Sequence, residues 1–170
     1  MRTELVLELL SVGDRRHGDL ELRLGGARHR CDSYYLSLDR VDAPSESRSK
    51  TRRVLAAILH GVAGTVRRSP ARSVVLLPYD FSDQYTGLLR LTIGAEGVAI
   101  ARVVSSVEGW RLDPSRAWSA SLETWGELRS WPFASGTREL AMSRPALLEH
   151  LKRAERLALR FARPRRARAR

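Results

Sequence analysis

The sequence predicts an α+β domain in which a mostly antiparallel sheet of about six to eight strands packs against two helices. Three observations predict this class. Short segments alternate apolar and polar residues, as half-buried strands do. Turn-forming residues join them by short connections, which favours antiparallel neighbours. Two longer segments, about 50–68 and 144–162, repeat apolar residues every three or four positions, which is typical of amphipathic helices.

The N-terminal third of the chain predicts a three-stranded meander. Residues 3–10 and 20–24 place leucines on one side and charged residues on the other, and Gly25-Gly26 ends the second run. A third strand is expected in the stretch 29–41, within the run SYYLSLDRV.

Three further strands are expected in the middle of the chain. Residues 73–79 form a continuous apolar run, which indicates a more central strand, and Pro78 marks its end or an edge position. Residues 88–93 and 98–104, separated by a glycine-bounded turn, predict a hairpin. Residues 117–133 have mixed periodicity, so a strand pair and a short helix both remain open there.

Capping and stop signals bound the two predicted helices. Ser69-Pro70 ends the first, and Ser143-Arg144-Pro145 opens the second, which Pro164 terminates. We expect one domain over residues 1–161, followed by a basic, disordered tail over 162–170.

The formal net charge of +11 is concentrated in the predicted helices and the tail. Residues 48–72 hold six arginines and one lysine without an acidic residue, and residues 144–170 hold nine arginines and one lysine against two glutamates. The remainder of the chain is mildly acidic. If the helices lie side by side, their outer sides form a positive surface that attracts an anionic partner, either nucleic acid or an acidic protein. The alternative is a pair of solvated helix faces. The arginines expected to contact an anionic partner are Arg52, Arg53, Arg67, Arg68, Arg153, Arg156, Arg160, Arg163, Arg165 and Arg166.

The loop after the apolar run at 73–79 is a second candidate site. It contains Tyr79, Asp80, Phe81, Asp83 and Tyr85, in which two carboxylates lie three residues apart among aromatics. Such a loop suits a protein partner, a metal, an amine or acid–base chemistry. Equally, the acidic residues are ordinary turn formers and the aromatics close a core.

Four tryptophans fall within 22 residues, whereas the first 109 residues have none. Tryptophan is enriched among interface hot spots, so we expect Trp110, Trp118 and Trp125 to include anchors for a protein partner. Burial in the core is the alternative for each of them and for Trp131.

His29 and Cys31 share one face of a strand, with Arg28 and Arg30 beside them. A thiolate in such surroundings is activated, but a buried, inert cysteine is the commoner outcome. Cys31 is the only cysteine, which excludes an internal disulfide framework and a cysteine-rich zinc site and favours a reducing compartment.

Other functional classes lack their signatures. No apolar run approaches the roughly 20 residues of a membrane span, and the N-terminus does not read as a secretory signal, so we expect a cytoplasmic protein without membrane insertion. No metal-ligand spacing, serine elbow or phosphate loop is present, and we expect no metal and no cofactor.

The sequence therefore favours a non-catalytic cytoplasmic binding or regulatory module whose partner is another macromolecule, most simply a protein, as in adaptor or toxin-neutralising proteins. The alternative is a nucleic-acid-binding protein that uses the arginine-rich helices and tail. A weaker alternative is an enzyme centred on Asp80 and Asp83. The oligomeric state is left open.

Overall fold

The computed structural model of the chain describes residues 7–11, 18, 20–25, 27–33, 48–82, 84–108, 128–130 and 140–162. Within these residues eight strands in two antiparallel sheets accompany two helices, so the predicted α+β class is confirmed. The elements are β1 (Leu7–Ser11), β2 (Leu20–Leu24), β3 (Ala27–Cys31), α1 (Arg48–Arg68), β4 (Val74–Phe81), β5 (Thr86–Ile93), β6 (Val98–Ser105), β7 (Leu128–Ser130), β8 (Leu140–Met142) and α2 (Arg144–Ala162).

The first sheet is the predicted meander, in the order β1-β2-β3. Leu22 lies opposite Leu9 on one side and opposite His29 on the other. The third strand begins at Ala27, earlier than the sequence predicts. Ala27, His29 and Cys31 face inward, while the two arginines between them are exposed. Because Ala27 is small and His29 is polar, the sequence of this strand shows no obvious alternation of hydrophobic and polar residues. Residues 34–41, to which the sequence assigned this strand, lie outside the described residues.

The second sheet has the order β4-β5-β6-β7, and β8 also pairs with β6. The hairpin of β5 and β6 is the one predicted, with Ile93 opposite Val98 at the turn. β4 is an edge strand whose register shifts between Pro78 and Asp80, in agreement with the position of the proline. Its side chains from 75 to 81 are nevertheless all buried, which explains its continuous apolar run.

The end of α1 and the beginning of α2 lie where local chemistry predicts. The Ser143 hydroxyl accepts from the Ala146 amide at 3.3 Å and so caps α2. At the end of α1 the Ser69 amide and hydroxyl both donate to the Thr65 carbonyl, at 2.9 Å each. These bonds satisfy groups that a helix end leaves without partners.

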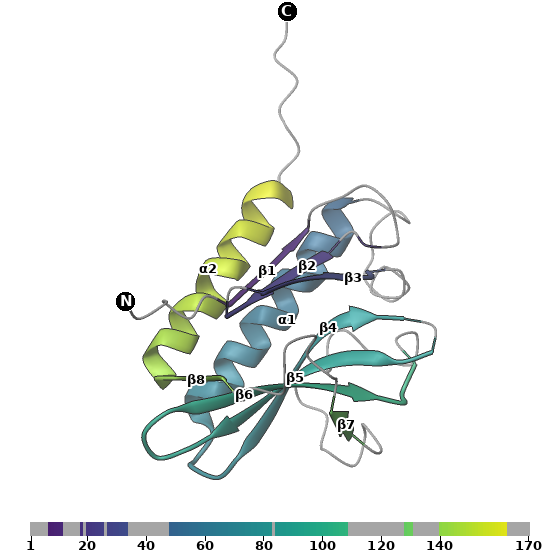
Figure 1. Ribbon diagram of the computed structural model, residues 1–170. Helices are drawn as coiled ribbons and strands as arrows, with labels where there is room; N and C mark the ends of the chain where they lie inside the picture. Colours follow the sequence, from purple (N-terminus) through teal and green to yellow (C-terminus); the bar gives the residue numbers. More distant parts are fainter. Residues whose placement is uncertain are drawn as a thin grey trace, which may run out of the picture.

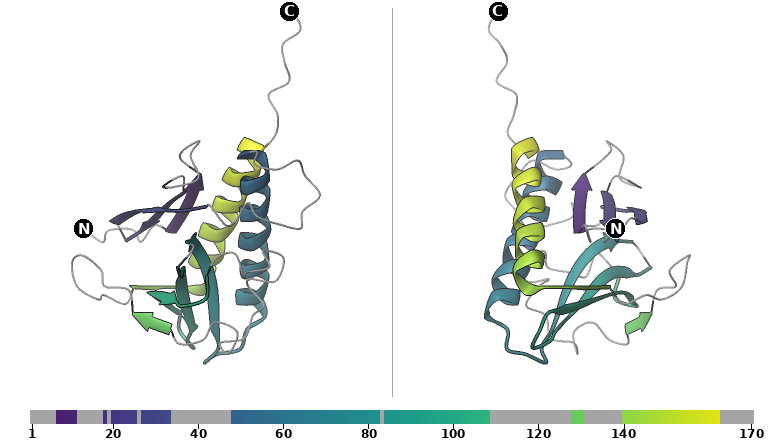
Figure 2. Two further views of the ribbon diagram at one scale, coloured as in Figure 1. Left: turned by 90° about the vertical axis from the view of Figure 1, so that its right-hand side faces the viewer. Right: turned by 60° about the vertical axis from the view of Figure 1, so that its left-hand side comes forward.

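The two helices form one layer, and both sheets lie on the same side of it (Figures 1 and 2). One apolar cluster joins the layers: it includes Leu22 of the first sheet, Leu89 of the second, Leu59 of α1 and Leu151 of α2. A smaller cluster of Leu76, Leu88 and Val103 lies apart from it. The apolar sides of both helices are thus used in the core, and their polar sides remain outside.

Candidate functional site

The two helices run antiparallel along their length. His60 Nδ1 of α1 lies 3.1 Å from Glu155 Oε1 of α2, and Arg144 Nη2 at the start of α2 donates to the Ser69 carbonyl after α1 at 2.8 Å. The N-terminal half of α1 therefore lies beside the C-terminal half of α2 (Figure 1).

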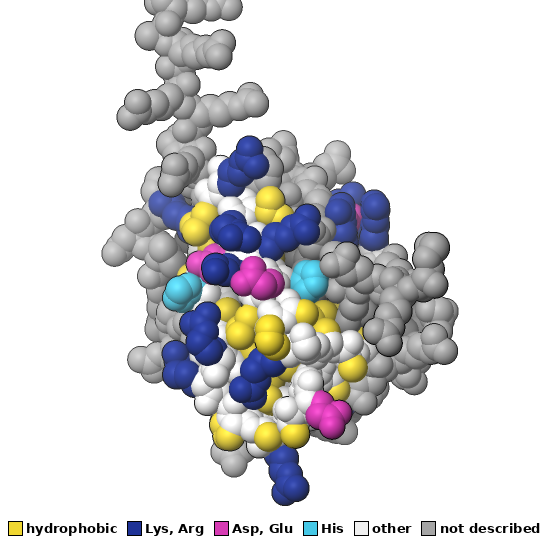
Figure 3. Space-filling view, turned by 90° about the vertical axis from the view of Figure 1, so that its left-hand side faces the viewer, with side chains coloured by type: hydrophobic (Ala, Val, Ile, Leu, Met, Phe, Trp, Pro, Cys, Tyr) yellow, Lys and Arg dark blue, Asp and Glu magenta, His cyan; other side chains and the backbone are white. Residues whose placement is uncertain are grey.

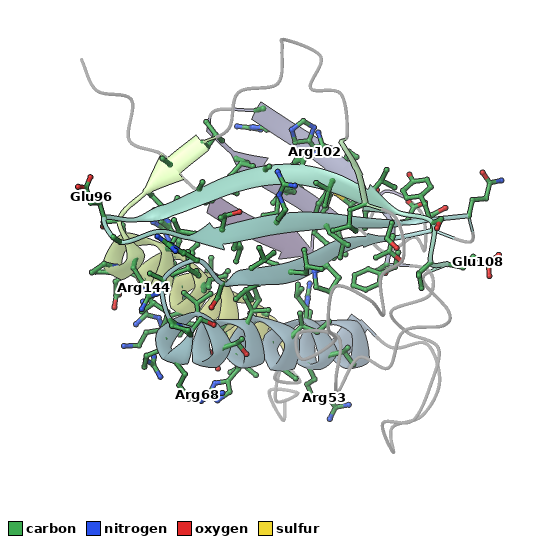
Figure 4. All side chains as sticks on the ribbon, turned by 90° about the horizontal axis from the view of Figure 1, so that it is seen from below. Arg53, Arg68, Glu96, Arg102, Glu108 and Arg144 are labelled. Carbon is green, nitrogen blue, oxygen red and sulfur yellow. The ribbon has the colours of Figure 1, made fainter. Side chains whose placement is uncertain are left out.

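Exposed cations occupy the sides of the helices that the core does not use. Their apolar residues, for example Val62 and Leu147, are completely buried. Figure 3, seen from the side on which α2 lies, shows lysine and arginine side chains among hydrophobic and acidic ones, and in Figure 4 Arg53 and Arg68 project from α1 away from the sheets. We call the exposed cations of the helices the basic face: Arg53, Arg67, Arg68, Lys152, Arg153, Arg156 and Arg160.

The basic face contains two acidic residues, each near a basic group. Glu155 contacts His60, and Glu149 lies 4.0 Å from Lys152. By contrast, no ion pair within the described part of the chain engages Arg53, Arg67, Arg68 or Arg160. Their guanidinium groups are therefore available to an external anion. Arg52, next to Arg53 in the sequence of α1, is half-buried.

The predicted loop site is largely internal. Tyr79 is 0% exposed, Phe81 1% and Asp80 6%, and Tyr85 is half-buried. The burial of both aromatics matches the alternative in which they close the core, and neither ring offers a surface to a partner. Asp83 lies outside the described residues.

Asp80 instead connects the two sheets. Its Oδ1 accepts from the Asp32 amide at 2.8 Å, and the Phe81 amide donates to the Asp32 carbonyl at 2.9 Å. Tyr85 Oη lies 3.5 Å from the other carboxylate oxygen. The end of β3 is thereby joined to the end of β4.

A buried arginine completes this polar group, which we call the junction cluster: His29, Cys31, Asp32, Tyr79, Asp80, Tyr85 and Arg102. Arg102 is only 6% exposed; its Nε donates to Tyr79 Oη at 2.9 Å, and its Nη1 lies 2.9 Å from His29 Nδ1. Figure 4 shows it among the strands, apart from Arg53, Arg68 and Arg144 on the helices. A buried charge needs such partners. Sequence reasoning missed this residue, although it is the one charge in the apolar run of β6.

Burial controls the titration of the junction cluster. It raises the pKa of Asp80 to about 6, and the nearby Asp32 carboxylate acts in the same direction, whereas the Asp32 amide and Arg102 oppose it. Burial raises the pKa of the Cys31 thiol to about 12, so the thiol stays protonated and is a poor nucleophile. Burial and Arg102 lower the pKa of His29. The structure thus brings His29 and Cys31 together on β3, as predicted, but in surroundings that suppress the thiolate.

The remaining predicted contact residues lie outside the described residues: Trp110, Trp118, Trp125, Arg163, Arg165 and Arg166. In the described part, no three His, Cys, Asp or Glu side chains come close enough to hold a metal ion. Of the two described helices, neither combines the length and apolar content that crossing a membrane requires.

The comparisons with known proteins were negative: no protein-family model, curated protein or solved structure matches this chain. The basic face and the junction cluster are the features of this chain that bear on its function.

Proposed function

We propose that this protein is a non-catalytic binding module that recognises nucleic acid through the basic face of the antiparallel pair α1 and α2. The observation that carries the proposal is the outward placement of arginines from both helices on one layer, several of them without an acidic partner in the described chain. Such a surface attracts phosphates and accelerates encounter with them.

The chemistry of this surface distinguishes nucleic acid from a protein partner. Stable protein interfaces depend on buried aromatic or aliphatic anchors. Among the described residues Leu159, at 45% exposure, is the one large hydrophobic side chain that is exposed, and Tyr79 and Phe81 lie in the core. Interfaces with nucleic acids are more polar and strongly cationic. The described surface supports a phosphate-bearing partner better than the protein partner that the sequence favoured.

Fluorescence anisotropy tests this proposal with labelled random-sequence DNA and RNA across a salt series. We expect the Arg156→Gln/Arg160→Gln variant to lower affinity about tenfold at moderate salt and to reduce the salt slope by about 2, because two phosphate contacts are lost. The charge control is Arg28→Gln/Arg30→Gln, which removes the same charge from two exposed positions on β3. It is expected to bind as the unaltered protein does. Because Arg30 lies 3.8 Å from the buried Glu21, the melting temperature of this control is measured together with its affinity.

Three outcomes oppose the proposal. Equal weakening by both variants would mean that net charge alone matters and not the basic face. If the protein does not bind nucleic acid at low salt but does bind polyglutamate, an acidic protein partner would be favoured. An effect confined to Arg163→Gln/Arg165→Gln/Arg166→Gln would assign binding to the C-terminal tail.

A further inference from the structure

Asp32, which directly follows β3, is bonded to three separate parts of the chain. Its side-chain Oδ1 accepts from the Gly18 amide at 2.5 Å. Its backbone amide donates to Asp80 Oδ1 at 2.8 Å, and its carbonyl accepts from the Phe81 amide at 2.9 Å. We call the last two bonds the β3–β4 contact, because they join the end of β3 in the first sheet to the end of β4 in the second (Figure 1).

The β3–β4 contact brings two carboxyl groups together at a buried position. Asp80 is 6% exposed, and its backbone-bonded neighbour Asp32 carries the second carboxyl group. A carboxylate loses hydration when it is buried, and another carboxylate close by repels it. A proton on Asp80 removes both costs. The closed contact therefore favours protonated Asp80 over ionised Asp80.

The other titratable and charged groups around Asp80 come from every strand packed at this point. They are Cys31 and Asp32 at the end of β3, Tyr79 on β4, Tyr85 before β5 and Arg102 on β6. Burial raises the pKa values of the thiol and both phenols far above neutrality, so these groups keep their protons. Arg102 lowers the pKa of Asp80, but burial outweighs this effect. Asp80 thus remains the carboxyl group that resists ionisation here.

His29 titrates in the same range with the opposite effect. It accepts the Arg102 guanidinium, with Nη1 2.9 Å from its Nδ1, and burial and Arg102 both lower its pKa. A falling pH therefore protonates Asp80, which stabilises the closed contact, and protonates His29, which destabilises it. A variant at position 80 that cannot ionise separates the two effects.

We propose that the β3–β4 contact is a proton-dependent connection between the two sheets: protonation of Asp80 favours its closed form, and ionisation of Asp80 beside the Asp32 carboxylate favours its open form. On opening, the proton passes to solvent and the end of β3 separates from β4. Both sheets stay folded, because Leu22 of the first and Leu89 of the second belong to the apolar cluster that holds them on the helices. This regulation is independent of the proposed function.

Amide hydrogen exchange of the full chain, followed by NMR at Asp32 and Phe81 and corrected for intrinsic rates, measures the opening. The pKa of Asp80 is about 6 in the closed form and returns towards 3.8 when the carboxyl group is hydrated. Relative to Asp80→Asn, the opening of the unaltered protein should therefore increase about tenfold from pH 5 to pH 7. His29 contributes to both proteins and cancels in this ratio.

Two further variants test the cause of the pH response. Asp32→Asn keeps an acceptor for the Gly18 amide but removes the like charge, so its response should fall between those of Asp80→Asn and the unaltered protein. Glu96→Gln is the control, because it removes one acidic group from an exposed turn at the other end of β5. It should respond as the unaltered protein does.

Urea distinguishes local opening from unfolding of the whole protein. Low concentrations should accelerate exchange in β5, the strand between β4 and β6, more than exchange at Asp32 and Phe81, because local opening exposes little surface. Equal urea dependence would mean that the contact opens only on global unfolding, which overturns the proposal. A constant ratio to Asp80→Asn between pH 5 and pH 7 would also overturn it. If Asp80→Asn does not fold, equal responses of Asp32→Asn and Glu96→Gln would do so instead.

Discussion

Asp80 is a carboxyl group whose burial makes the stability of the protein depend on pH in the acidic range. Its pKa is raised from 3.8 to about 6 in the folded protein, where it accepts the Asp32 amide. The folded state therefore binds the proton more tightly than the unfolded state does. Its contribution to stability is present at low pH and is lost as the pH rises from about 4 through 6.

The Asp80→Asn variant keeps an acceptor for the Asp32 amide but cannot ionise. As the pH rises from 4 to 7, the stability of this variant should increase relative to that of the unaltered protein by about 2–3 kcal/mol, since each pKa unit corresponds to about 1.4 kcal/mol. Urea denaturation at several pH values measures this difference. His29, whose pKa is lowered, produces the opposite slope in both proteins and cancels in the comparison. Parallel pH profiles would contradict the expected burial of the charge.

Gly87 has no room for a side chain. A Cβ at this position would lie 2.8 Å from Asp80 Cβ and 3.1 Å from the ring of Tyr79, next to the shifted register of β4. We expect Gly87→Ala to destabilise the protein by about 1–3 kcal/mol, as overpacking usually does. Thermal unfolding followed by circular dichroism measures the loss of stability. An unchanged melting temperature would show that β4 and β5 move apart to accept the extra methyl group at little cost in free energy.

Gly64 illustrates the opposite case within an element. It lies in α1, and a Cβ there would contact only the guanidinium of Arg68, at 3.4 Å, which can move. Because glycine is about 1 kcal/mol less favourable than alanine inside a helix, Gly64→Ala should stabilise the protein by about 0.5–1 kcal/mol. The same thermal measurement applies, and Gly87→Ala serves as the matched substitution with the opposite sign. If Gly64→Ala destabilised the protein, the absence of a side chain at this position of α1 would be required for packing.

The helices also show how far local pattern determines an element. The segment predicted at about 50–68 forms a helix over Arg48–Arg68, and the one predicted at 144–162 forms it over Arg144–Ala162. Apolar spacing and the Ser143 cap act within a few residues, so the sequence displays them directly. β3 was not anticipated at Ala27–Cys31 because its inward residues show little alternation of apolar and polar side chains, and its strand state depends on pairing with β2.

At the scale of the whole molecule, one apolar cluster joins both sheets to both helices. We therefore expect a single cooperative unfolding transition. Leu22→Ala in the first sheet and Leu89→Ala in the second, both completely buried, should each lower the free energy of unfolding by about 2–5 kcal/mol in that one transition.

Coincident denaturation curves by far-ultraviolet circular dichroism and tryptophan fluorescence measure this behaviour. Leu159→Ala is the matched control, because its side chain is 45% exposed and its loss should cost less than about 0.5 kcal/mol. Two separate transitions, each sensitive to only one of the core substitutions, would show that the sheets fold independently.

The sequence by itself determined the α+β class, both helices, the hairpin and the concentration of positive charge, because each depends on residues close together in the chain. The tertiary structure decided which of those residues are available. It left most arginines of both helices exposed on the side away from the core and buried Tyr79 and Phe81 in the core. It also joined Asp80 to Asp32 and brought Arg102 to His29, across 48 and 73 residues. Such contacts depend on how elements pack, and no local period or motif encodes that packing.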